Sequence, residues 1–102
     1  MKGRHKILSD ILRDKALTKF EKKVYEAVSM ISRGETRSYG WVARRIGSPE
    51  AYRAVGNALN KNQYPEAIPC HRVIKSDGSI GGYAKGSAAK RRLLISEGLD
   101  VR

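Results

Sequence analysis

The stretch SYGWVARRIGSPEAYRAVGNAL, residues 38–59, decides how this chain folds. Ser38 is a good helix cap, so a helix is expected over residues 39–46. Proline is favoured at the first position of a helix, so Pro49 predicts a second helix over residues 49–59. Two short helices separated by so few residues are typical of a helix-turn-helix unit, although an ordinary helical hairpin has the same pattern.

Upstream of this unit a further helix is expected. Thr18 and Glu21 have the spacing of a capping box, and apolar residues recur at helical spacing from there towards Gly34, which is expected to end the helix. Residues 1–17 carry mixed charge with a weak amphipathic pattern. This basic N-terminal segment fits either a short helix or a loose arm, and its role is not evident.

Downstream, a connecting loop over residues 60–69 leads into an expected β-hairpin. Residues 71–75 and 80–83 have strand character, and the sequence between them, Ser76 to Ser79, is typical of a turn. A hairpin that follows a helix-turn-helix is the wing of a winged-helix domain. With a last helix over residues 87–97, the chain is expected to be mainly α with a small β-hairpin wing, a winged helix-turn-helix domain over residues 18–102.

The charge of the chain indicates a polyanionic partner. Its 102 residues, enough for one domain, include 21 Lys and Arg against 10 Asp and Glu, a net charge of +11. Arg44, Arg45 and Arg53 lie in the helix-turn-helix stretch, which favours nucleic-acid binding over a helical hairpin that only packs a core. A basic solvated surface or an acidic membrane partner are the weaker alternatives.

Cysteine usage and apolar content indicate where the protein works. The single cysteine, Cys70, has no partner within the chain for a disulfide, which is typical of a reducing compartment. No apolar run approaches the length of a membrane span, and the N-terminus lacks the apolar core of a signal peptide. We therefore expect a soluble intracellular protein, cytoplasmic and associated with the nucleoid, or nuclear, with no membrane contact.

The chemistry is expected at Ile68-Pro69-Cys70-His71-Arg72-Val73. A thiol beside an imidazole and a guanidinium can become an activated nucleophile, and Arg72 together with the net charge is expected to lower the pKa of the thiol. Adjacent side chains of a strand point to opposite faces, so a direct contact of Cys70 with His71 does not follow. A buried, purely structural cysteine remains the alternative.

A carboxylate in the last expected helix is a candidate partner for this group. Lys90, Leu94 and Glu97 recur at i, i+4 and i+7 and so share one face. The helix dipole disfavours a carboxylate in the last turn, so Glu97 needs a cationic or hydrogen-bonding partner. His71 or an arginine on the surface would serve, and spacing alone leaves both open.

Taken together, these residues resemble a known family. From Phe20 to Gly98 the chain is similar to the C-terminal, active-site domain of O6-alkylguanine-DNA alkyltransferases. The blocks that carry the resemblance are Gly34-Glu35-Thr36-Arg37-Ser38-Tyr39, Arg53-Ala54-Val55-Gly56-Asn57-Ala58, Asn62, Ile68-Pro69-Cys70-His71-Arg72-Val73, Gly81-Gly82-Tyr83 and Leu93-Leu94-Ile95-Ser96-Glu97-Gly98.

The resemblance implies a set of catalytic roles. Cys70 would accept the alkyl group, and His71 would deprotonate it through a water molecule. Glu97 would orient His71, and Asn62 would brace the active-site loop. Tyr39 would help to rotate the nucleotide out of the duplex and would donate a proton to the departing guanine.

It also implies a DNA interface and a base pocket. The helix that starts at Pro49 would lie in the minor groove, with Arg53 filling the gap left in the base stack. The further DNA-binding positions are Ser38, Tyr39, Ala51, Tyr52 and Asn57, and the pocket positions are Val73, Tyr83, Ala84 and Lys90. Tyr52 stands where the family often has a small residue, and Ala84 where a hydroxyl residue is common.

The predicted activity is therefore repair by direct reversal. One alkyl group of O6-alkylguanine in double-stranded DNA would move irreversibly to Cys70 of a monomeric protein, without cofactor or metal. The main alternative is a lesion-binding module like the alkyltransferase-like proteins, which recruit other repair factors and usually carry tryptophan in place of the acceptor cysteine. A winged-helix transcription regulator and a cysteine hydrolase are weaker alternatives.

Overall fold

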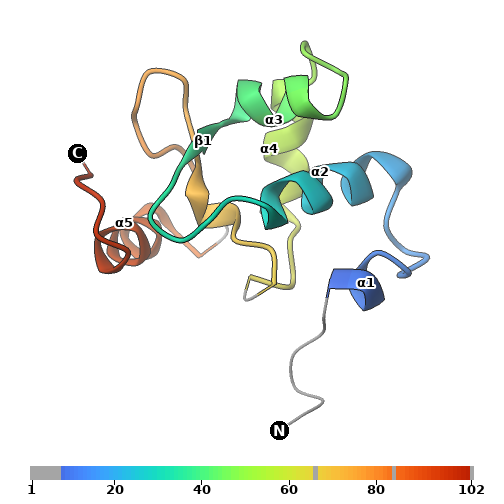
Figure 1. Cartoon of the computed structure of the whole chain (residues 1–102), viewed down its shortest axis with the longest axis horizontal. Coiled ribbons are helices and arrows are strands. Elements are labelled where there is room, and N and C mark those ends of the chain that lie inside the picture. The colour runs from blue at the N-terminus through green and yellow to red at the C-terminus, as the bar shows by residue number, and fades with distance from the viewer. Residues whose placement is uncertain (1–7, 66, 84, 102) are drawn as a thin grey trace, which may run out of the picture.

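The structure, a computed structural model, describes residues 8–65, 67–83 and 85–101 (Figure 1). Figure 1 shows α2, α3 and α4 grouped together, with α5 on the other side of a two-stranded sheet. The expectation of a mainly helical chain with a small sheet is confirmed. The elements in chain order are α1 (Leu8–Ile11), α2 (Lys19–Ser29), β1 (Arg37–Ser38), α3 (Tyr39–Arg45), α4 (Tyr52–Asn60), the 3-10 turn η1 (Cys70–Arg72), β2 (Val73–Ile74) and α5 (Ser87–Ser96).

Helix α2 begins where its sequence predicts but ends earlier than predicted. The Thr18 hydroxyl accepts a hydrogen bond from the N–H of Glu21 at 3.0 Å, and the Glu21 carboxylate accepts one from the N–H of Thr18 at 2.9 Å, which confirms the capping box. The helix ends at Ser29, well before Gly34. Two residues past this end, the carbonyl of Ile31 accepts a hydrogen bond from Arg72 at 2.8 Å.

The helix-turn-helix is confirmed, with one boundary corrected. The Ser38 hydroxyl caps α3 by accepting a hydrogen bond from the N–H of Trp41 at 2.9 Å, and Gly47 follows the helix with a φ of +83°, a conformation that suits glycine. Pro49, however, lies in a turn that is closed by the hydrogen bond from the N–H of Ala51 to the carbonyl of Ser48 at 2.8 Å. The second helix, α4, therefore starts three residues later than predicted, at Tyr52.

The predicted pairing of the wing was wrong. The strand β2 pairs with β1 in parallel, with Arg37 opposite Val73, whereas the expected return strand at residues 80–83 is absent from the described residues. The turn itself is present, because the N–H of Lys75 donates to the carbonyl of Ser79 at 2.9 Å. Past this turn, the carbonyl of Gly82 accepts a hydrogen bond from a side chain of α5, so this segment faces α5 instead of continuing a sheet.

The core lies between α2, α3 and α4 and extends to η1. Ten large side chains are fully buried, which at about 1.5–3 kcal/mol for each large apolar side chain supplies the main drive for folding. Ile11 of α1 is one of them, so the short-helix alternative is the correct one for residues 8–11, whereas residues 1–7 lie outside the described part. The ten residues are Tyr25, Lys90, Ile11, Ile68, Leu94, Val24, Val28, Val42, Val55 and Val73.

Candidate active site and nucleic-acid interface

Cys70 is the first residue of η1, and its sulfur contacts Asn62, two residues past the end of α4. Its side chain is only 6% exposed, and Pro69 precedes it with a φ of −77°. The Asn62 amide donates to the Cys70 sulfur at 3.3 Å and to the carbonyl of Ile68 at 2.9 Å. Asn62 therefore links the loop before the cysteine to the cysteine itself.

The environment of the sulfur favours the thiol in this structure. Burial raises the pKa of Cys70, and the hydrogen bond from Asn62 and the charges of Lys90 and Lys85 oppose this effect only in part. The prediction that Arg72 lowers the pKa of the thiol was wrong, because its guanidinium turns away from Cys70 and towards Glu97. A nucleophile at this position therefore needs a base.

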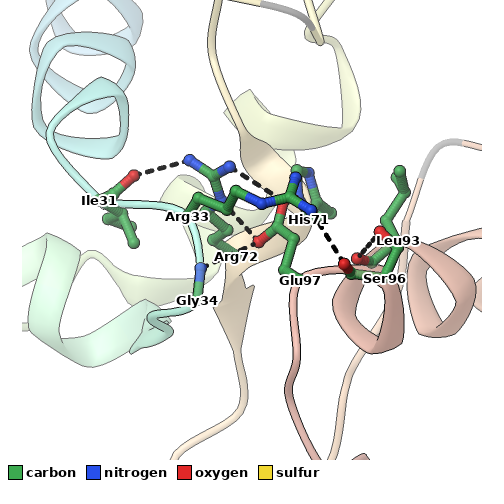
Figure 2. A network of polar contacts seen from close by, with 8 residues as sticks. All are labelled: Ile31, Arg33, Gly34, His71, Arg72, Leu93, Ser96 and Glu97. Carbon is green, nitrogen blue, oxygen red and sulfur yellow. Dashed lines mark hydrogen bonds and ion pairs between the residues drawn. The ribbon is translucent and has the colours of Figure 1, made fainter.

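The candidate base is His71, which contacts Glu97 at the end of α5 (Figure 2). The His71 Nε2 atom lies 2.8 Å from the Glu97 Oε2 atom, and the two side chains are 8% and 4% exposed. A carboxylate without a proton can only accept, so Nε2 carries the shared hydrogen and Nδ1 is the nitrogen left to act as a base.

Glu97 also binds Arg72, so both partners that the spacing left open are present. The Arg72 Nε and Nη2 atoms donate to the two Glu97 oxygens, each at 2.9 Å, and the N–H of Gly34 donates at 3.4 Å. Burial alone would raise the pKa of Glu97. The hydrogen bonds from Arg72 and His71 outweigh burial and lower this pKa to about 2, so the carboxylate stays ionised.

On the other side of the sulfur, Lys90 links α5 to Tyr39. The fully buried Lys90 ammonium donates to the carbonyl of Val73 at 2.6 Å, to that of Gly82 at 3.0 Å and to the Tyr39 hydroxyl at 3.4 Å. Burial lowers the pKa of Lys90 to about 8, with the nearby Cys70 acting in the opposite direction. Burial also raises the pKa of Tyr39, so its phenol keeps its proton and can donate it.

A glycine lets this tyrosine approach the pocket segment closely. Gly81 has a φ of +72°, and a Cβ atom there would lie 3.2 Å from the Tyr39 hydroxyl oxygen. Tyr83 follows two residues later, and burial raises the pKa of its phenol, with Cys70 as the second cause. Tyr39 and Tyr83 thus both lie near the sulfur.

A groove of about 690 Å³ runs along α4 and meets this pocket at Tyr39. Its charged side chains are the cations Arg44, Arg53 and Lys75 and one acid, Asp77, in the turn after β2. Tyr52 also lines it and is 49% exposed, unusual for so large a side chain. A basic groove with an exposed aromatic residue is suited to a nucleic-acid strand.

The predicted site residues fall into three groups. Those gathered around the sulfur are Asn62, His71, Glu97, Tyr39, Lys90, Val73 and Tyr83, whereas Arg53, Tyr52 and Asn57 lie exposed on α4. Ser38 is occupied by capping α3, Ala51 is the first flanking residue of α4, and Ala84 lies outside the described residues. The sequence offered an arginine as a partner for Glu97 but did not single out Arg72, which was expected to act on the thiol.

The described residues contain neither a candidate membrane span nor a candidate metal site. None of the helices in residues 8–65, 67–83 and 85–101 is long and apolar enough to cross a membrane. Over the same ranges, no group of three or more His, Cys, Asp and Glu side chains is arranged to hold a metal ion.

Comparison with known families gives a match over most of the chain. Residues 19–99 match the family model described as 6-O-methylguanine DNA methyltransferase, DNA binding domain. The chain is 49% identical over 81 residues to a methylated-DNA–protein-cysteine methyltransferase of Methanosarcina acetivorans, and 46% identical over 88 residues to that of Mycobacterium tuberculosis. These matches cover 79% and 86% of the chain but only 52% and 53% of the relatives, so the chain spans about half the length of the curated relatives it matches.

Solved structures give the same picture. The structure of Mycobacterium tuberculosis OGT in complex with DNA aligns with a TM-score of 0.78 and 46% identity, over 80% of this chain and 50% of that one. S. pombe Atl1, in complex with damaged DNA containing O6-carboxymethylguanine, aligns with a TM-score of 0.75 and 34% identity, over 82% of this chain and 80% of that one. The chain thus resembles both a longer and a similarly sized protein.

Proposed function

The chain belongs to the 6-O-methylguanine DNA methyltransferase family, and on that premise we propose that it repairs DNA by transferring the alkyl group of O6-alkylguanine irreversibly to Cys70. The observation that carries the proposal is the arrangement at the only cysteine. Asn62 donates to its sulfur at 3.3 Å, and the neighbouring His71 is oriented by Glu97 at 2.8 Å. A buried thiol beside an oriented imidazole is a nucleophile paired with its base.

His71 activates the sulfur in this proposal. Because burial raises the pKa of Cys70, the thiol must lose its proton when the substrate is in place, and a water molecule carries that proton to Nδ1 of His71. The role of Glu97 is to hold the imidazole in the tautomer with Nδ1 unprotonated. The role of Asn62 is to stabilise the developing thiolate and to keep the loop in place.

The transfer step is a displacement at a saturated carbon. The thiolate forms a bond to the alkyl carbon, the bond from that carbon to guanine O6 breaks, and its electron pair stays with the guanine. Tyr39 donates its phenolic proton to the guanine, which leaves neutral; exchange with solvent then returns a proton to Tyr39 and removes the extra proton from His71. The thioether left on Cys70 is chemically inert, so each molecule acts once.

The α4 groove brings the lesion to the sulfur. An alkyl group on O6 is buried in a duplex, so the nucleotide must be rotated out of the stack before transfer. Tyr39 lines the groove, and its hydroxyl contacts Lys90 close to Cys70, which supports a role in guiding the nucleotide. Arg53 on α4 would fill the vacated space from the minor groove, and the net charge of +11 would provide affinity for phosphates in any sequence.

A lesion-binding module without transfer is the second candidate. The similarity in length to S. pombe Atl1 favours this candidate, because the chain covers 80% of that protein but only about half of the methyltransferase relatives. The presence of Cys70 with its base favours transfer. Both candidates share the same DNA groove, so they differ only in what happens at the sulfur.

Intact mass after incubation with a duplex containing O6-methylguanine separates the two candidates. The proposal expects a gain of one methyl group that maps to Cys70, with none in a Cys70→Ser variant. Tight binding of the lesion without a mass change would support the binding module, and the absence of both would contradict both functions.

A further inference from the structure

One buried carboxylate, Glu97, is shared by two side chains, the imidazole of His71 and the guanidinium of Arg72 (Figure 2). Its Oε2 atom lies 2.8 Å from the His71 Nε2 atom and accepts a hydrogen bond from the Arg72 Nη2 atom at 2.9 Å. Its Oε1 atom accepts from the Arg72 Nε atom at 2.9 Å. The guanidinium thus grips both oxygens, and the imidazole shares one of them.

The other end of Arg72 is also held. Its Nη1 atom donates to the carbonyl of Ile31 at 2.8 Å, just past the end of α2. The loop after α2 is tied to the end of α5 beside this contact, because Arg33 donates to the carbonyl of Ser96 at 2.9 Å. Arg72 is only 16% exposed in its side chain, so it cannot turn towards Cys70 without breaking three hydrogen bonds.

We propose that Arg72 is a positioning residue for the transfer, which holds the Glu97 carboxylate in place and keeps His71 neutral, with its proton on Nε2, as the base for Cys70. The proposal rests on the proposed function, because it concerns the proton that the thiol must lose. The Arg72 side chain hydrogen-bonds to Glu97 and to the carbonyl of Ile31, and of these two only Glu97 has a role in that reaction, so the effect of Arg72 would pass through the carboxylate.

The net charge of the buried cluster of His71, Arg72 and Glu97 depends on whether His71 is protonated. With His71 neutral, Arg72 and Glu97 cancel and the cluster carries no net charge. With His71 protonated, the cluster carries one uncompensated positive charge at a site where all three side chains are at least four-fifths buried. Without Arg72, a protonated imidazole would instead pair with Glu97 alone. Arg72 therefore disfavours the protonated imidazole, which cannot act as a base.

The other charged groups around His71 act in the same direction or are neutral. His71 shares a cavity with the cations Lys85 and Arg92 and with the phenol of Tyr83, and Cys70 is its neighbour in the chain. Both cations are exposed and therefore screened by solvent and salt. Of Arg72, Lys85 and Arg92, Arg72 is the one that hydrogen-bonds to the shared carboxylate and the least exposed of the three, so its charge should have the largest effect on His71 among them.

The pH profile of transfer tests this proposal. Single-turnover methyl transfer from duplex DNA to Cys70 would be followed by intact mass from about pH 5 to about pH 9, the range in which imidazoles titrate. Arg72→Met removes the charge and keeps a long side chain. We expect the acid limb of its profile to move to higher pH by about one unit, so that transfer on that limb is about tenfold slower than in the wild type.

Two further variants separate charge from structure. Arg72→Lys keeps the charge and loses the fork that grips both oxygens, so its acid limb should stay at the wild-type pH while its plateau rate falls. Arg33→Ala removes a neighbouring tie between the same loop and α5 without touching Glu97, and should leave the profile unchanged. Thermal melting and lesion binding of each variant at each pH show whether it is folded.

The outcomes are distinct. A rate that falls by the same factor at every pH in Arg72→Met would overturn the proposal and leave a purely structural role. If Arg72→Met does not fold, the pH profile of Arg72→Lys tests the proposal. An acid limb at the wild-type pH supports the role of the charge, and a shifted acid limb contradicts it. A wild-type protein that gains no methyl group contradicts the proposed function itself, whereas normal wild-type transfer with unshifted variants contradicts only the role of Arg72.

Discussion

The pocket around Cys70 and the groove along α4 meet at Tyr39 but are built on opposite principles. In the pocket, the charged groups are buried and tied by several hydrogen bonds, as Lys90 and Glu97 are. In the groove, Arg53 and Tyr52 are exposed on α4. Chemistry needs groups held in one position away from water, whereas binding DNA of any sequence needs charge that water and salt can reach. The two regions should therefore respond differently to mutation.

The largest effect is expected at the sulfur itself. Cys70→Ser replaces the thiol by a hydroxyl, which does not ionise under these conditions, so methyl transfer should be abolished. Since Cys70 lies outside the α4 groove, binding of a lesion-containing duplex should persist. Mass spectrometry and a binding titration on the same sample measure both effects. Loss of binding together with transfer would show that the two regions are not separable.

The next largest effect is expected for Glu97→Gln, on stability. The change leaves the buried Arg72 without its anion, which costs about 3–5 kcal/mol in the free energy of unfolding. Urea denaturation measures this loss, with Arg53→Ala in the exposed groove as a control expected to unfold like the wild type. An unchanged unfolding midpoint for Glu97→Gln would contradict the account of a tightly held buried cluster.

The same carboxylate predicts how stability depends on pH. The pKa of Glu97 is about 2 in the folded protein, below the ordinary value of 4.5. The unfolded state therefore binds the proton first, so the stabilisation is present above about pH 4.5 and is lost as the pH falls towards 2. Comparing unfolding of wild type and Glu97→Gln across this range should show a smaller acid loss in the variant. If wild type and Glu97→Gln lost the same stability between about pH 4.5 and 2, Glu97 would not be the source of the acid loss.

A smaller effect, confined to DNA, is expected for Arg53→Ala. If Arg53 fills the base stack as proposed, its removal should weaken binding and slow transfer from a duplex about tenfold, because holding the nucleotide outside the stack costs a few kcal/mol. Transfer from free O6-methylguanine base should be unchanged, since it needs no rotation. Equal loss with both substrates would place Arg53 in the pocket chemistry instead.

The smallest effect is expected for Tyr52→Ala. The side chain is 49% exposed, so the free energy of unfolding should change by no more than about 0.5 kcal/mol. If a base stacks on this aromatic ring, the variant should lose about 1–3 kcal/mol of duplex affinity. A smaller loss would mean that the ring contacts the sugar and not a base. A titration at two salt concentrations, with Tyr52→Phe as the matched control, separates stacking from charge.

Local sequence signals were accurate where the partners are near in the chain. The capping box of Thr18 and Glu21 and the cap of Ser38 are present as predicted, because each involves groups within three residues. The start of α4 predicted from Pro49 was three residues too early, because a proline also suits the turn before a helix. The prediction of the wing hairpin was wrong because β2 pairs with β1, which lies far upstream in the sequence. The carbonyl of Gly82, in the expected return strand, accepts a hydrogen bond from Lys90 instead.

The candidate site divides in the same way. The motif around Cys70 and the helical spacing of Lys90 and Glu97 named the groups that come together. They did not show that Arg72 binds Glu97, or that burial raises the pKa of the thiol where a lowered pKa was expected. A guanidinium reaches several ångströms from its backbone, so its partner depends on which distant segments pack beside it.

By itself, the sequence determined the helix-turn-helix, the family and the chemical groups available, because these depend on spacing along the chain. Only the tertiary structure decided how the groups are shared: the buried Lys90 between Val73, Gly82 and Tyr39, and Glu97 between His71 and Arg72. The physical reason is that burial and long-range contacts set which charge meets which. Both depend on packing segments that lie far apart in the sequence.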